Sequence, residues 1–179
     1  MKPLLLIAAA TLCFASTEPR VSRASIVAVE KSINEEFANK SGDPYDFLGN
    51  ARGTYLEGYG ALFTVELDLI NTSQITPNPF KQTVTPQEIA TTRERKLKKL
   101  VILRENMRSL MVNAGGTLEG LPPNERISME AVLLYNKWED SRGMPRRLFM
   151  SAEKQKLRDA AAAHAGQPEL AAIIEEQER

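Results

Sequence analysis

The sequence predicts an α+β domain with a small mixed or antiparallel sheet of three to four strands and helices packed mainly on one face. Segments 54–70 and 126–135 alternate apolar and polar residues with the period of a half-buried strand. Segment 86–114 repeats apolar residues at helical spacing. The order is helix, strand or hairpin, long helix, hairpin, helix, and each strand has one polar face, which favours helices on the other face only.

The N-terminus has the pattern of a secretory signal peptide. Lys2 precedes an apolar run, residues 4–15, and polar residues follow at once. The run is shorter than the roughly 20 apolar residues of a spanning helix. We therefore expect cleavage after Ala15. Lipid attachment at Cys13 is the disfavoured alternative, because Leu12 stands where that processing requires a small residue.

Cleavage divides the chain into a signal peptide (1–15), a flexible leader (16–24) and a single α+β domain (25–179). Cys13 is the only cysteine, so the mature chain has no disulfide. We expect a periplasmic or extracellular protein with no transmembrane segment in the mature chain. Lys and Arg number 23 and Asp and Glu number 23, and this balance argues against nucleic acid as a partner.

The first helix is expected from Ser25 to about Lys40. Its apolar residues fall three and four positions apart and define one face: Ile26, Val29, Ile33 and Phe37. The segment 41–53 is expected to be a loop. Its Asp43, Asp46 and Asn50 lack the ligand spacing of a helix-loop-helix calcium site, so we predict no metal there.

Glu57 breaks the apolar face of segment 54–70, beside Gly58 and Gly60. A bulge at the glycines would turn Glu57 to solvent, and the sequence favours this interpretation because an unpaired buried carboxylate is costly. A functional, buried Glu57 is the second interpretation. A hairpin that turns at residues 58–60, making two strands, is the third.

The clearest local signal is the capping box of Thr85 and Glu88, with Pro86 at the first helical position. It follows a polar connection, 71–84, and begins the long helix 86–114. Gly115 and Gly116 are expected to end that helix in the left-handed conformation.

A second hairpin is predicted from strand 126–135 and the short strand 146–151, joined by the loop 137–146. Ser151 is expected to cap the next helix, which ends at Gly166. Pro168 then begins a last helix that we expect to continue through residues 175–179.

Basic residues crowd the first half of the long helix, at Arg93, Arg95, Lys96, Lys98 and Lys99. They could bind phosphate, an anionic lipid or nucleic acid, although the aromatic residues that would stack on bases are absent here. The favoured interpretation is a solvated helix face, with Glu94 paired to Lys98 one turn away. Trp138, in the loop 137–146, fits equally well as an anchor for a partner or as a cover over the end of the hairpin.

Catalytic motifs are missing from the sequence, which contains one histidine, His164, and no Gly-x-Ser-x-Gly motif. Carboxylate chemistry at Glu57, Glu66 and Asp68 would require two of them to face each other across a cleft. Glu66 and Asp68 lie on the polar strand face and fit better as surface charges. We predict no cofactor and no metal.

The favoured function is therefore an exported, non-enzymatic domain that binds a partner protein or assists assembly of the envelope. The alternative is a carboxylate-based hydrolase, or a domain that binds an anionic ligand through Glu57 or the basic helix residues 93–99. Neither the partner nor the oligomeric state follows from the sequence.

Overall fold

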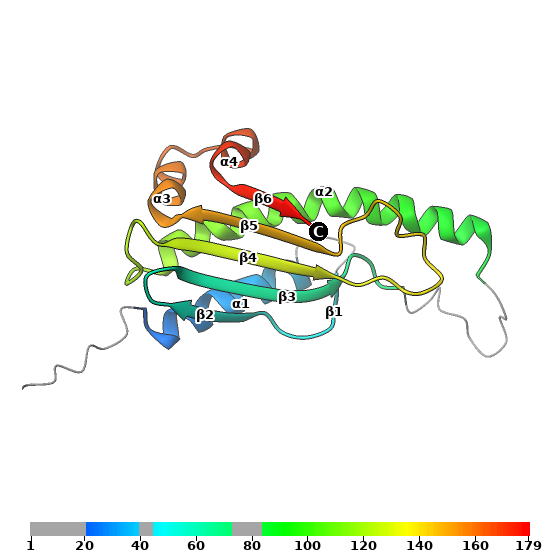
Figure 1. Ribbon diagram of the computed structural model, residues 1–179, viewed down its shortest axis with the longest axis horizontal. Helices are drawn as coiled ribbons and strands as arrows, with labels where there is room; N and C mark the ends of the chain where they lie inside the picture. The colour runs from blue at the N-terminus through cyan, green and yellow to red at the C-terminus, as the bar shows by residue number, and fades with distance from the viewer. Residues whose placement is uncertain (1–20, 40–44, 73–83) are drawn as a thin grey trace, which may run out of the picture.

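The computed structural model describes residues 21–39, 45–72 and 84–179 (Figure 1). The predicted signal peptide and most of the connection 71–84 lie outside these residues. The described elements are, in order, α1 (Arg23–Asn39), β1 (Asp46–Phe47), β2 (Arg52–Leu56), β3 (Gly60–Asp68), α2 (Pro86–Thr117), β4 (Arg126–Leu133), β5 (Arg147–Glu153), α3 (Lys154–Ala162), α4 (Gln167–Ile173) and β6 (Glu175–Glu178).

The predicted class, α+β with a small sheet, is confirmed, but the sheet has six strands among the described residues rather than three to four. The order is β1, β3, β4, β5, β6, and β2 pairs with β3 on the same side as β1. Of the strand pairs formed by the described residues, only β3 with β4 is parallel. Parallel neighbours need a crossover, and the segment between β3 and β4 contains the long helix α2.

The glycine-rich segment forms a hairpin, so the predicted bulge was wrong and the hairpin alternative was right, although Glu57 is exposed to solvent as the bulge interpretation expected. Glu57, Gly58 and Tyr59 make the turn between β2 and β3. Gly58 has φ 81° and Gly60 has φ 135°, which side chains rarely tolerate. A Cβ on Gly60 would lie 1.9 Å from the carbonyl oxygen of Arg126, so glycine also allows β4 to approach.

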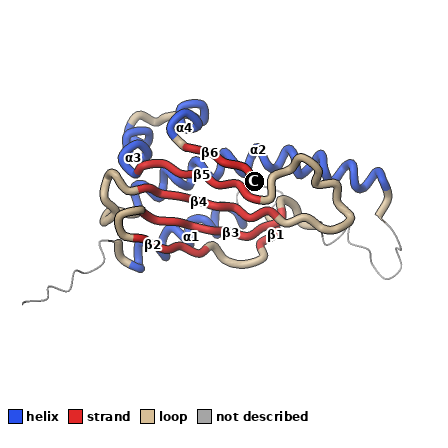
Figure 2. Tube along the Cα trace, viewed as in Figure 1, coloured by secondary structure: helices blue, strands red, loops and turns tan. Residues whose placement is uncertain are grey.

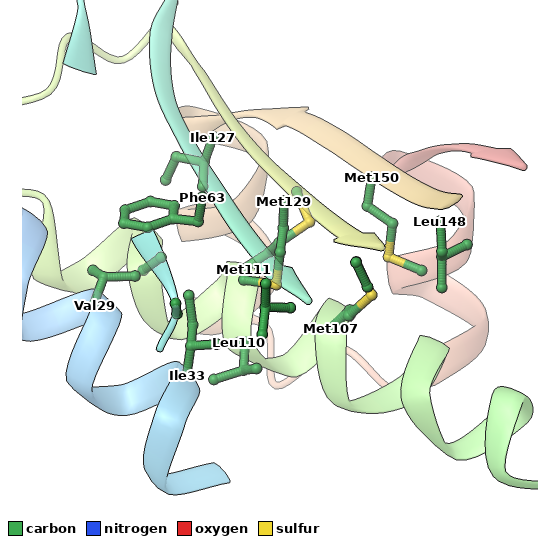
Figure 3. Close-up of a cluster of buried hydrophobic side chains, with 14 of the residues drawn as sticks. Val29, Ile33, Phe63, Met107, Leu110, Met111, Ile127, Met129, Leu148 and Met150 are labelled. Atoms are coloured by element: carbon green, nitrogen blue, oxygen red, sulfur yellow. The ribbon is translucent and has the colours of Figure 1, made fainter. Parts of the chain in front are cut away.

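The core lies between one face of the sheet and helices α1 and α2, which run behind the sheet in Figure 1. The four apolar residues predicted to face inward from α1 are each at most 3% exposed. Figure 3 shows side chains from both helices meeting those of β3, β4 and β5: Val29, Ile33, Phe63, Met107, Leu110, Met111, Ile127, Met129, Leu148 and Met150.

The leader and the long helix differ from prediction at their ends. Val21 is buried and α1 begins at Arg23, so the last residues of the expected leader belong to the folded unit.

The capping box of Thr85 and Glu88 is confirmed. Gly115 does not stop α2, which continues to Thr117. Its lack of a side chain allows α3 to approach, since a Cβ there would lie 3.3 Å from Leu157 Cβ.

The C-terminal predictions were wrong at two points. Ser151 lies inside β5 rather than at a helix N-cap, and its hydroxyl is 2.8 Å from that of Ser128. The residue that precedes α3 is Glu153. The last predicted helix ends at Ile173, and residues 175–178 form the edge strand β6. Pro168 stands in the first turn of α4, as predicted.

Candidate functional site

The three candidate carboxylates do not meet across a cleft. Glu57 is exposed in the β2–β3 turn. Glu66 is exposed on β3, where it lines a polar cavity of about 210 Å³ with Arg52 and Thr64. Asp68 was wrongly expected to be a surface charge: it is only 6% exposed and forms an ion pair with Lys96. This arrangement lacks the pair of facing carboxylates that glycoside hydrolysis requires.

The basic residues of α2 form neither an anion-binding patch nor a fully solvated face. Lys96 and Lys99 are 1% and 4% exposed. The predicted pair of Glu94 and Lys98 is present, at 2.7 Å. Arg93 donates to the backbone oxygen of Asp140 at 2.8 Å. The charges along residues 93–99 therefore point in different directions.

The remaining candidates are dispersed. Arg95 is exposed on α2. Trp138 is partly buried, and its indole nitrogen is buried without a hydrogen-bond partner among the described residues. His164 is exposed in the turn after α3, at φ 52°.

Lys96 lies in a buried cluster that joins three parts of the chain. Its Nζ atom is 2.6 Å from Asp68 Oδ1 at the end of β3 and 2.5 Å from Glu139 Oε2 in the β4–β5 loop. The Nζ atom also lies 5.0 Å from the ring centroid of Tyr135. Glu139 accepts hydrogen bonds from the backbone and the side chain of Asn136. Because Lys96 is closed to solvent, the cluster fits a structural tie better than a binding site.

The cluster holds two carboxylates for one lysine, and titration should reflect this imbalance. Burial raises the pKa of Asp68 above its ordinary value of 3.8 despite the attraction of Lys96. Burial, with the nearby carboxylates of Asp68 and Glu139, raises the pKa of Tyr135 to about 12. The folded protein therefore keeps a proton on Asp68 at pH values at which the unfolded chain has lost it. The stability that this proton contributes is fully present below the ordinary pKa of aspartate and is lost as pH rises through the pKa of Asp68 in the folded protein.

We expect Asp68→Asn to raise the free energy of unfolding at neutral pH, because burial disfavours the charged form of Asp68 and Lys96 keeps Glu139 as its partner. The Ile70 amide donates a hydrogen bond to Asp68 Oδ1 at 3.2 Å. Asparagine keeps an oxygen for this amide and for Lys96, and it removes the surplus charge. Below about pH 4 the gain should vanish, because aspartic acid is then neutral too. Urea unfolding of both proteins across this range measures the difference. A large loss at neutral pH would mean that the cluster needs both anions.

The two edges of the sheet differ in how their backbone groups are satisfied. On β2, the Gly53 amide donates to Glu30 of α1 at 2.7 Å, and the Gly53 carbonyl accepts from Arg23 at 3.1 Å. Just before β2, the Ala51 amide donates to Asn34 at 2.8 Å. Side chains of α1 thus occupy positions that another strand would need, which is one way in which proteins protect sheet edges.

The opposite edge is β6, at the top of the sheet in Figures 1 and 2. Arg147 and Arg179 exchange both backbone hydrogen bonds, at 2.9 and 3.1 Å. In an antiparallel ladder, such pairs alternate with pairs that do not bond to each other. The pairs Glu178–Leu148 and Glu176–Met150 are therefore pairs that do not bond to each other. The backbone N–H and C=O groups of Glu176 and Glu178 thus point away from β5, toward the outside of the sheet. We call these outward groups the β6 edge.

Arginines of α2 hold β6 in place. Arg104 donates to Glu176 at 2.8 Å and also to Glu178, and Arg108 donates to the other oxygen of Glu176 at 2.8 Å. These contacts place Glu176 and Glu178 on the helix side of the sheet. Their carboxylates are paired, so the edge does not present bare negative charge on that side.

The helices α1 and α2 leave one face of the sheet uncovered (Figure 1). A cavity of about 220 Å³ lies beside the β6 edge on that face. We call this side the open face. Phe149 lies partly buried in the cavity wall, and Arg147 pairs with Glu130 at 3.4 Å. The wall combines apolar and charged groups from four strands and the residue after β6: Leu62, Glu130, Arg147, Phe149, Gln177 and Arg179.

Comparison of the chain with family models, curated proteins and solved structures finds no match, so the site is interpreted from its geometry. Among the described residues, no helix combines the length and apolar character needed to cross a membrane. Within the same residues, no group of three or more His, Cys, Asp or Glu side chains is placed to hold a metal ion.

Sequence reasoning missed the β6 edge because residues 175–179, EEQER, have the composition of a solvated helix end. No residue in it is β-branched or aromatic. The spacing of Arg104 and Arg108, four apart on one helix face, was the only available signal, and it does not identify its acidic partner.

Proposed function

We propose that this protein is an exported, non-enzymatic binding module that accepts an extended segment of protein as an additional strand on β6. The observation that carries the proposal is the contrast between the edges: side chains of α1 occupy β2, whereas Glu176 and Glu178 direct backbone donors and acceptors outward. Strand addition is a common mode of peptide recognition, in which backbone hydrogen bonds supply affinity.

The cavity beside β6 supports this function because it supplies specificity. Residues of an added strand alternate between the two sides of the sheet. Those on the open face would lie beside Gln177 and Arg179, next to the apolar wall of Phe149. The proposal includes export by the signal peptide expected at residues 1–15. It also includes the placement of the helices mainly on one side of the sheet.

A proline substitution tests the role of the outward backbone groups. Glu176→Pro removes the outward N–H, while the inward hydrogen bonds of Gln177 and Glu175 to β5 remain. Glu176→Ala is the matched control, because it loses the same carboxylate contacts with Arg104 and Arg108 but keeps the N–H. Peptides selected from a random phage-displayed library against the dilute protein provide the probe.

We expect selected peptides that bind the wild type and Glu176→Ala but bind Glu176→Pro about tenfold more weakly or worse. Circular dichroism should show that both variants remain folded. Equal binding to both variants would exclude the β6 edge, and failure to select any peptide would argue against strand addition.

A further inference from the structure

The β6 segment, residues 175–179 with the sequence EEQER, is complementary to itself when two copies run antiparallel. The outward groups belong to residues 176 and 178. Bonded pairs in an antiparallel ladder must join outward residues to outward residues. Placing Glu176 opposite Glu178 of a second copy satisfies this condition and centres the two-fold axis on Gln177.

In this register the charges on the open face match. Gln177 lies opposite its own copy on the axis, and Glu175 lies opposite Arg179 at both ends. Opposite charges that face each other across two strands stabilise the pair. Shifting the centre by one residue in either direction loses both Glu–Arg pairs. Within one copy, Glu175 already contacts Arg126 at 2.8 Å, but its side chain is 65% exposed and accessible to a second arginine.

On the helix side the same register is also neutral. Each copy contributes the two glutamates of β6 together with Arg104 and Arg108, which already bind them. Pairing Glu176 with Glu178 of the other copy therefore brings together two compensated groups. Charged edges usually prevent self-pairing because their charges are bare, and here that repulsion is offset.

Helix α2 provides apolar surface beside the same edge. Leu97 and Val101 are 40% and 53% exposed. They stand seven and three positions before Arg104, on the helix face that reaches β6. A two-fold axis through Gln177 brings α2 of both copies to the same side of a continuous sheet, where these side chains can become less exposed.

We propose that the segment received by the β6 edge is β6 of a second copy of this chain, antiparallel and centred on Gln177. This inference rests on the proposed strand addition and names its occupant. A strand of this length buries little surface, so the dimer belongs among weak assemblies and forms with rising concentration.

Sedimentation velocity over a concentration series tests self-association. The wild type should shift from monomer to dimer. Arg179→Glu places glutamates opposite Glu175 at both ends and should weaken the dimer by about tenfold or more, whereas Arg179→Lys should retain it. A wild type that stays monomeric at all concentrations would overturn the inference, as would a dimer unaffected by Arg179→Glu.

Cross-linking tests the register. In a Cys13→Ser background, Gln177→Cys should form a disulfide-linked dimer under mild oxidation, because the Cα atoms of a non-bonded antiparallel pair lie about 4.5 Å apart, which is within the range that a disulfide spans. Thr54→Cys, exposed on β2 at the far edge, is the control and should not. Equal cross-linking at both positions would contradict the proposed axis.

If the chain is monomeric but peptides still bind in a manner that Glu176→Pro abolishes, strand addition stands and the second copy is excluded.

Discussion

Replacing Lys96 with methionine should lower the free energy of unfolding by about 3–5 kcal/mol. Methionine fills similar space but removes the cation that lies between Asp68 and Glu139. Both carboxylates would remain buried, since Asp68 is 6% exposed and the side chain of Glu139 is 3% exposed. An uncompensated buried charge is among the most destabilising changes that a single substitution can make. Urea unfolding at neutral pH measures the loss.

Two controls separate the charge effect from lost packing. Lys98→Met removes a neighbouring lysine whose pair with Glu94 is exposed, and it should cost less than about 1 kcal/mol. Adding Asp68→Asn and Glu139→Gln to Lys96→Met should recover much of the stability, because the stranded anions are then neutral. A loss below about 1 kcal/mol in Lys96→Met alone would show that the cluster is not a stabilising tie.

Replacing Lys154 with methionine should cost about 3 kcal/mol or more. Its Nζ atom donates to the backbone oxygens of Leu118, Glu119 and Leu121 at 2.7, 3.0 and 2.7 Å, just after the end of α2. Lys154 is 3% exposed, and burial lowers its pKa. Methionine would leave carbonyl groups in this closed turn without their donor, and such groups are costly when buried.

Hydrogen exchange and urea unfolding together check this expectation. Exchange should accelerate around residues 118–125, where the amides of Lys154 and Gln155 also bond to Glu125 and Pro123. Lys156→Met provides the control, because Lys156 is exposed and makes only a 3.4 Å pair with Glu153. Similar stability in the two variants would mean that water replaces the ammonium group at little cost.

Predictions from sequence succeeded where a few neighbouring residues decide the structure. The capping box needs only Thr85, Pro86 and Glu88, and it forms as expected. The apolar face of α1 and the alternation in β4 likewise follow from local spacing. The hairpin at Glu57 was recognised as an alternative but not preferred, because turn and bulge make similar use of glycine.

The sequence by itself determined the capped start of α2, the inward face of α1 and of the main strands, and the α+β class, because these depend on periodicity and local hydrogen bonding. Only the tertiary structure decided the state of residues distant in the chain. Lys96 is buried because Asp68 and Glu139 converge on it, and EEQER becomes a strand because β5 and the arginines of α2 bind it. Such long-range partners override weak local preferences, and for that reason the candidate site at β6 could not be read from its own residues.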